Sequence, residues 1–417
     1  MKRVAVALGL VLAAALVLLA ACGSVASRRP GDRIAGRTLT IYASAPLHGA
    51  SGVQGQAVLN GARMALVQVH GRIGKYRIVL VPVDDSNPRK GGWDPGQTSA
   101  NARLAVANPS TIGYLGEVDS GASAIAIPVL NRAGIPQISA TSAAVGLTSS
   151  DPGASPGEPQ KYYPTGLRTF ARVIPNDAVQ AIAQVRLQQS MGCKRTFVLV
   201  DGGVDGSNAA TSFQLAAAAH KLALAGTADF DPHAVDYTSL ARGVAQTGAD
   251  CVLINAAPES NAALLTEQVA AALPQALLFA AADLAQGSFT DPSHGGVPVS
   301  LDSRLALTAA AVAPADYPPA GRAFLSAYAR RYGDPPTDAI FGYEAMSLLL
   351  SAIARATHGG KVAAERSKVL HAIFSTHARA SVLGVYSIDR NGDTTLRRVG
   401  AYRVVAGQLR LWQVIDA

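Results

Sequence analysis

The first residues that could bind a ligand stand where a predicted strand meets a predicted helix. A buried strand is predicted at residues 111–115, and Ser120-Gly121 opens a helix predicted at residues 122–133. A helix N-terminus leaves backbone N–H groups free, and with the Ser120 hydroxyl these groups could hold an anion such as a carboxylate. Ligands of open parallel sheets bind beyond the carboxyl ends of the strands, where Ser120 falls. The alternative is that Ser120 serves only as the N-cap of its helix.

Motifs of common enzyme classes are missing from the sequence. The segment after the first predicted strand lacks the glycine fingerprint of dinucleotide binding. The sequence contains no phosphate loop, no Gly-x-Ser-x-Gly elbow and no His-Glu-x-x-His motif. Residues 389–393 resemble part of a calcium loop, but glycine and glutamate are not at the required positions, which favours a hairpin turn. The sequence therefore predicts no catalytic residues, no metal site and no cofactor.

Alternating strands and helices must position Ser120. Strands predicted at residues 39–43, 76–83, 111–115 and 136–138 alternate with helices predicted at 56–70, 96–107 and 122–133. This alternation indicates parallel sheets with helices on both faces. A loop at residues 149–166, rich in Pro and Gly, interrupts the pattern, and a second α/β series follows at residues 178–280. The 417 residues suffice for two such halves, each with its own core.

The C-terminal part of the sequence departs from this alternation. Helices are predicted at residues 321–331, 339–357 and 361–375, and antiparallel strands at 384–388, 396–405 and 408–415. Asn391-Gly392 and Ala406-Gly407 are predicted to make the tight turns between these strands.

The N-terminus predicts export. Lys2 and Arg3 precede an uncharged apolar run that ends at Cys22, as in an export signal. Leu19-Ala20-Ala21-Cys22 resembles the bacterial lipobox, which implies a signal peptide at residues 1–21, lipidation of Cys22 and a tether at 22–37. The alternative is a plain membrane-anchor helix. In either case the protein is expected at the cell membrane, facing the periplasm or exterior.

The formal charge of +8 needs a separate explanation. Arginines cluster in the tether, where they would favour an anionic membrane surface, or merely keep a linker soluble. Basic residues are not interleaved with aromatic ones, so nucleic acid is not an expected partner.

Cys193 and Cys251 remain after lipidation of Cys22. Both stand at the start of predicted strands, and the export route permits oxidation. If those strands are neighbours, a disulfide could join them; the alternative is two buried thiols.

Several segments together resemble the branched-chain amino acid (leucine/isoleucine/valine-binding) family of ABC-importer solute-binding proteins. The resemblance extends from about residue 39 to residue 415, and the segments that carry it are Leu39–Ala45 with Gly49, Gly55 and Gly61, then Asp84-Asp85, then Ala133-Gly134-Ile135-Pro136, then Tyr343-Glu344-Ala345. It implies the type I periplasmic-binding fold: α/β, with two Rossmann-like lobes joined by three crossing strands. The lobes implied are residues 38–170 plus 304–382, and residues 171–303 plus 383–417.

The resemblance also implies a function. The protein would be a monomeric, lipid-anchored receptor that captures a small polar solute, an amino acid or related carboxylate or amide, and delivers it to an ABC permease. The alternative is a sensor of the same fold that serves a membrane signalling partner without transport.

By resemblance, ligand-binding residues can be assigned to the cleft. Ser120 matches the serine that binds the amino acid carboxylate, Thr141 and Ser142 match a segment that offers a backbone N–H and a hydroxyl, and Asp283 matches the acid that binds the ammonium group. For Asp283 the alternative is an ordinary loop acid.

The aromatic walls of the family's pocket are replaced in this sequence. Gln54, Asp205 and Ala257 stand at positions where the family often has aromatic residues, so a more polar pocket is expected. Tyr162 and Tyr163 could replace one wall if the loop at 149–166 folds over the cleft. Alternatively, they lie on an exposed loop.

Overall fold

The computed structural model describes residues 31–417 except 88 and 90, so the predicted signal peptide, Cys22 and most of the tether lie outside the described residues.

The first of two large sheets contains mainly parallel strands. The strand order is β2-β3-β1-β4-β5-β6, and only β2 is antiparallel to its neighbour. The strands are β1 (Thr38–Ala45), β2 (Arg72–Ile73), β3 (Tyr76–Asp84), β4 (Thr111–Leu115), β5 (Gln137–Ser139) and β6 (Phe170–Arg172).

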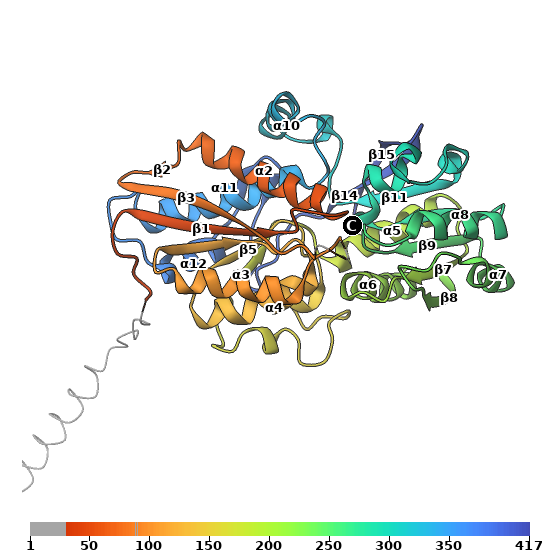
Figure 1. Ribbon diagram of the computed structural model, residues 1–417, viewed down its shortest axis with the longest axis horizontal. Coiled ribbons are helices and arrows are strands. Elements are labelled where there is room, and N and C mark those ends of the chain that lie inside the picture. Colours follow the sequence, from red (N-terminus) through yellow and green to blue (C-terminus); the bar gives the residue numbers. More distant parts are fainter. Residues whose placement is uncertain (1–30, 88, 90) are drawn as a thin grey trace, which may run out of the picture. The chain divides into compact units, whose positions relative to one another are not determined.

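Side-chain alternation along β1 explains why helices cover both faces of this sheet. Leu39 and Ile41 point into a core shared with α2 (Gly52–Gln68) and α11 (Ala339–Ala356). Tyr42 points the other way, into a core with α3 (Pro95–Ala107) and α4 (Ser120–Arg132). Figure 1 shows these helix pairs on opposite sides of the sheet.

Late helices complete the first core. They are α10 (Pro319–Tyr332), α11 and α12 (Arg366–Phe374), and the longest of them, α11, packs along α2. Among the described residues, α11 alone is long and apolar enough to cross a membrane, but most of it is buried inside the protein. Its hydrophobicity is therefore accounted for by the core.

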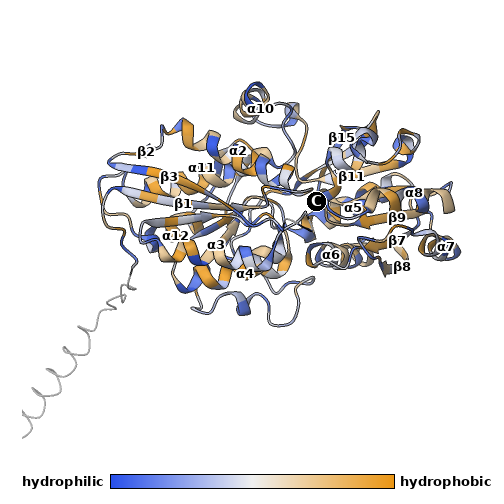
Figure 2. Cartoon of the chain, in the orientation of Figure 1, coloured by the Kyte–Doolittle hydropathy of each residue, from blue (hydrophilic) through white to orange (hydrophobic). Residues whose placement is uncertain are grey.

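The second sheet has the order β15-β14-β11-β10-β9-β7-β8. Its parallel strands are β7 (Arg195–Val200), β8 (Ala223–Asp229), β9 (Cys251–Asn255), β10 (Leu277–Ala280) and β11 (Leu305–Ala309). One face packs on α5 (Asp177–Ser190) and α6 (Val204–Ala219), and the other on α7 (Thr238–Gln246) and α8 (Ala262–Ala272). The short helix α9 (Gly287–Thr290) follows β10. Figure 2 shows hydrophobic residues along β9, an inner strand of this sheet.

The antiparallel edge of the second sheet is a hairpin of β14 (Arg398–Val405) and β15 (Gln408–Asp416). Its turn is Ala406-Gly407, as predicted, and both residues have positive φ (50° and 75°), which matches the turn to the twist of the strands. Asn391-Gly392 does lie in a tight turn, with an antiparallel bridge between Ile388 and Thr394 on its two sides. The predicted pairing of the two strands beyond this bridge needs correction, because β14 pairs with β11 and β15. The strand before the turn, β13 (Gly384–Tyr386), pairs with β12 (Arg379–Ser381).

The turn at residues 389–393 fastens a crossing segment instead. Asp389 Oδ1 accepts hydrogen bonds from three successive backbone nitrogens of the turn, at 2.8–2.9 Å. Asp393 then pairs with Arg172 of β6 at 2.6 Å. The turn therefore anchors the chain to the first sheet just before it enters β14 of the second.

Two predicted lobe boundaries are displaced. The boundary at 303/304 assigns residues 305–309 to the first lobe, but β11 pairs with β10 and β14 in the second sheet. The first sheet likewise extends through Arg172, two residues beyond the boundary at 170/171. The remaining boundaries stay a prediction.

Cys193 and Cys251 form a disulfide with their Cα atoms 5.8 Å apart. The two strands that follow or contain them, β7 and β9, are direct neighbours, with Thr196 opposite Cys251. The disulfide therefore joins the starts of two parallel strands, and the alternative of two free thiols is wrong.

Candidate ligand-binding site

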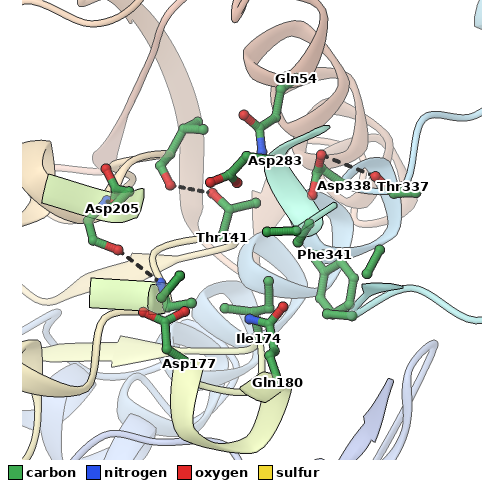
Figure 3. Close-up of a pocket in the computed structure, with 18 of the residues that line it drawn as sticks. Gln54, Thr141, Ile174, Asp177, Gln180, Asp205, Asp283, Thr337, Asp338 and Phe341 are labelled. Carbon is green, nitrogen blue, oxygen red and sulfur yellow. Dashed lines mark hydrogen bonds between the residues drawn. The ribbon is translucent and has the colours of Figure 1, made fainter. Parts of the chain in front are cut away.

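A cavity lies at the carboxyl ends of the strands, between the two sheets. The space that it leaves for water-sized groups measures about 60 Å³, and residues from the connections of both sheets line it. This position, beyond the carboxyl ends of the strands, is typical of small-molecule binding. Figure 3 shows polar side chains from several elements directed toward it. Those without charge are Gln54, Ser120, Thr141, Gln180, Gln184 and Thr337.

Ser120 holds the start of α4 in place. Its Oγ accepts hydrogen bonds from the backbone nitrogens of Ala143 and Ala144, each at 3.1 Å. Its own backbone nitrogen donates to Oδ1 of Asp205 at 2.8 Å. Asp119, the N-cap residue of α4, makes no capping hydrogen bond. A carboxylate therefore does occupy the N-terminus of α4, but it comes from α6, across the cavity.

Five carboxyl groups line the cavity, and among its described lining residues there is no Lys, Arg or His. They are Asp119, Asp177, Asp205, Asp283 and Asp338. Each comes from a different segment: the starts of α4, α5, α6 and α11, and η3 (Ala282–Leu284). The charge of this cavity is accordingly negative whenever several of the groups are ionised.

Burial raises the pKa of every one of these groups. It raises the pKa of Asp177 to about 7 and that of Asp338 to about 6. The pKa values of Asp119 and Asp283 rise well above their ordinary value, first through burial and then through repulsion from Asp205. Burial also raises the pKa of Asp205, which the hydrogen bond from Ser120 opposes.

A buried cation that acts on Asp177, Arg172, has other partners. Arg172 is fully buried, and its guanidinium binds Asp393 at 2.6 Å and the carbonyl oxygens of Ser142 and Ala144 at 3.0 and 2.7 Å. It does lower the pKa of Asp177 somewhat. Because its donors are already engaged, it does not reach the cavity to neutralise the acids there.

A second contact between the lobes involves another acid. The Ser51 hydroxyl, at the N-cap of α2, donates to Oε2 of Glu259 at 3.0 Å. A Cβ on Gly92 would lie 2.1 Å from Oε1 of the same residue, so the Glu259 carboxylate packs directly against this glycine. Burial raises the pKa of Glu259 as well. Two carboxylates of the second lobe thus contact helix starts of the first.

Most of the predicted site residues meet at the cavity. Gln54, Ser120, Thr141, Asp205 and Asp283 all line it. The Thr141 hydroxyl donates to the carbonyl oxygen of Val118 at 2.7 Å, which fixes its orientation.

The other predicted site residues do not line the cavity. Ser142 is fully buried, with its hydroxyl 2.8 Å from that of Ser123 and 3.0 Å from the carbonyl oxygen of Glu117, so its predicted role toward a ligand is corrected to a structural one. Tyr162 and Tyr163 are buried in a cluster with Ile127 of α4, where the Tyr163 hydroxyl donates to Leu147 O at 2.7 Å. They form neither a cavity wall nor an exposed loop surface.

Sequence reasoning missed three of the acids. Asp119 directly precedes Ser120 at the start of α4. Asp177 is the first residue of α5, and Asp338 directly precedes α11. The available signal was an acidic residue just before the start of a predicted helix. Among the described residues, no group of three or more His, Cys, Asp or Glu is placed to hold a metal ion.

Comparisons place this architecture among known proteins. The family model described as periplasmic binding protein matches residues 38–408. Leucine binding protein LivK of Thermotoga maritima is 20% identical, with a TM-score of 0.74 over 91% of this chain and 99% of that chain. No curated protein sequence matches the chain.

Two further solved structures are similar. LivJ of Streptococcus pneumoniae, a branched-chain amino acid transporter substrate binding protein in complex with isoleucine, is 17% identical with a TM-score of 0.74, covering 91% of this chain and 100% of that chain. A solute binding protein of an ABC transporter from Rhodopseudomonas palustris, in complex with 4-hydroxybenzoate, is 17% identical with a TM-score of 0.73, covering 91% and 97%. These structures share the fold of this chain.

Proposed function

Since this chain belongs to the periplasmic binding protein family, we propose that it captures a small polar solute in the cavity between its lobes and delivers it to an ABC permease. The two-lobed α/β architecture expected from the sequence is confirmed as the type I periplasmic-binding fold. Membership of the family supports a ligand-binding receptor outside the cytoplasm. The permease partner, the lipid anchor on Cys22 and the monomeric state are parts of the proposal.

The carrying observation is that both lobes contribute to one cavity. Ser120 and Thr141 belong to connections of the first sheet, whereas Asp205 and Asp283 follow strands of the second. A ligand bound there contacts both lobes, so it stabilises their closed arrangement relative to an open one. Closure around a ligand is what allows a receptor to present its loaded state to a partner.

A ligand screen tests the receptor assignment. We expect the full chain, purified in detergent, to melt at a higher temperature with one member of a panel of amino acids, amines, amides, small carboxylates and polyols. A ligand at a thousand times its dissociation constant stabilises the folded state by about 4 kcal/mol, which is easily seen. Absence of any shift across the panel would count against the assignment.

Uptake separates transport from sensing. If the receptor feeds a permease, cells that lack this protein will take up the radiolabelled ligand more slowly than cells that carry it. Equal uptake in the two strains, with binding intact, would instead favour the sensor alternative.

A further inference from the structure

We propose that the cavity takes an organic cation with one or more ammonium groups and no carboxylate, because Asp205 already supplies the carboxylate at the N-terminus of α4. This inference rests on the proposed receptor function and specifies the class of its ligand. It departs from the expectation that Ser120 binds the carboxylate of an amino acid.

The first argument is that the anion position is filled from within the protein. The backbone nitrogen of Ser120 is at the start of α4, where the helix itself offers no acceptor. It donates to Oδ1 of Asp205 at 2.8 Å. Side chains also pack closely against the first turn of α4: a Cβ on Gly121 would lie 2.6 Å from the Trp93 ring and 3.5 Å from Val204. A ligand carboxylate would have to displace the start of α6 before reaching these donors.

The second argument is an unsatisfied acceptor at the cavity. Oδ2 of Asp119 is buried and has no hydrogen-bond partner among the described residues. A buried carboxylate oxygen without a donor is costly, and a ligand N–H would satisfy it. A nearby ammonium group would also favour the ionised form of Asp119, whose pKa burial and Asp205 raise well above its ordinary value, whereas a ligand carboxylate would disfavour that form.

The third argument is charge. The cavity brings Asp119, Asp177, Asp283 and Asp338 together, and its described lining has no basic side chain. An ammonium group offsets the repulsion among them, whereas an anionic ligand increases it. The binding of a cation is thus favoured at this position over that of a neutral or anionic solute of similar size.

The ligand is organic rather than a metal ion. The acids come from five separate segments, and among the described residues no three metal-ligating side chains converge. The walls between the acids include small apolar residues, among them Ala143, Ala281 and Ala310, which suit methylene groups. Amide oxygens of Gln54 and Gln180 add acceptors for N–H donors (Figure 3).

A matched set of small molecules tests the inference by isothermal titration calorimetry on the full chain at neutral pH. Putrescine carries two ammonium groups on four methylenes, butanediol replaces both by hydroxyls, and ornithine adds one carboxylate to the putrescine frame. We expect putrescine to bind, butanediol not to bind, and ornithine to bind at least about tenfold more weakly than putrescine. Leucine and benzoate complete the panel.

The Asp205→Ala variant provides a second test of the inference. Removing this carboxylate frees the Ser120 nitrogen, so the preference for putrescine over ornithine is expected to shrink or reverse. Asp229→Ala, which removes an exposed acid at the end of β8, is the matched control and should leave the ratio unchanged. If the ratio of the affinities for putrescine and ornithine is the same in Asp205→Ala as in the wild type, the role given to Asp205 is overturned.

The outcomes separate this inference from the receptor function. Binding of leucine, ornithine or benzoate without binding of putrescine would overturn the cationic ligand class while leaving the receptor function intact. Equal affinities for putrescine and butanediol would overturn the charge argument. Binding of none of the five would count against both.

Discussion

Asp205 and Ser120 connect the two lobes through one hydrogen bond, in which the Ser120 backbone nitrogen donates to Oδ1 of Asp205 at 2.8 Å. The acid stands in the first turn of α6, and the serine is the first residue of α4. The contact therefore places a side chain of the second lobe where a helix N-terminus of the first lobe attracts an anion. In a receptor that closes around its ligand, this bond contributes to the closed state directly.

Ser120→Ala tests what the serine hydroxyl does. That hydroxyl accepts hydrogen bonds from the buried backbone nitrogens of Ala143 and Ala144. Without it both donors lose their partner, so we expect the free energy of unfolding in urea to fall by about 1–3 kcal/mol. Ligand affinity, once a ligand is in hand, should change less than stability. Unaltered stability together with a large loss of affinity would show that the hydroxyl contacts the ligand.

The disulfide offers a test of stability in the second lobe. Cys193 and Cys251 are separated by 58 residues, and closing such a loop in the unfolded chain is worth about 4 kcal/mol on the chain-entropy view. We expect the Cys193→Ala, Cys251→Ala double variant to unfold at clearly lower guanidinium concentration than the wild type. Reductant should lower the wild-type midpoint toward that of the variant and leave the variant unchanged. A reductant effect of equal size on both proteins would contradict this account.

Much of the fold could be predicted because it depends on local pattern. Buried strands followed by amphipathic helices predicted both sheets, and the rule that ligands bind at carboxyl strand ends placed Ser120 at the cavity. Asp283, which also lines the cavity, was predicted from the resemblance to the family. The turn at Ala406-Gly407 followed from the preference of such turns for positive φ. For the sheets, Ser120 and the turn, the physical cause lies within a few residues of the feature.

What could not be predicted depends on contacts across the chain. Asp205 was expected only as a substitute for an aromatic wall, because the sequence does not show that α6 begins opposite α4. Tyr162 and Tyr163 pack beside α4 since Glu158 and Leu147 O bind their hydroxyls, at 2.5 and 2.7 Å. No periodicity in a Pro- and Gly-rich loop reveals such partners.

Cys22→Ser distinguishes the two predicted modes of membrane attachment. If Cys22 is lipidated and residues 1–21 are removed, the Cys22→Ser variant loses the acyl chains and no longer incorporates labelled fatty acid. We expect label in the wild type only, with the mature chain recovered in the membrane fraction. A variant that stays in the membrane at wild-type levels, with no label in either protein, would favour the plain anchor helix. Lys2 and Arg3 are kept in both proteins so that export is equal.

The pH dependence of stability tests the burial of acids at the cavity. Burial raises the pKa of Asp177 to about 7 from an ordinary value of 3.8. Between these two values the folded protein holds a proton that the unfolded chain releases, so folding is favoured at low pH. The stability that this group contributes is present below about pH 4 and is lost as the pH rises toward 7, at up to about 1.4 kcal/mol per pH unit.

Asp177→Asn isolates this contribution, because the amide has nearly the same shape and does not ionise. We expect the free energy of unfolding of the ligand-free variant to exceed that of the wild type at pH 7, and the difference to vanish as the pH falls toward 4. Urea titrations at several pH values measure this difference, and Asp229→Asn controls for the loss of one negative charge at an exposed site. A difference between Asp177→Asn and wild type that does not vary with pH would show that Asp177 is not held in its protonated form by burial.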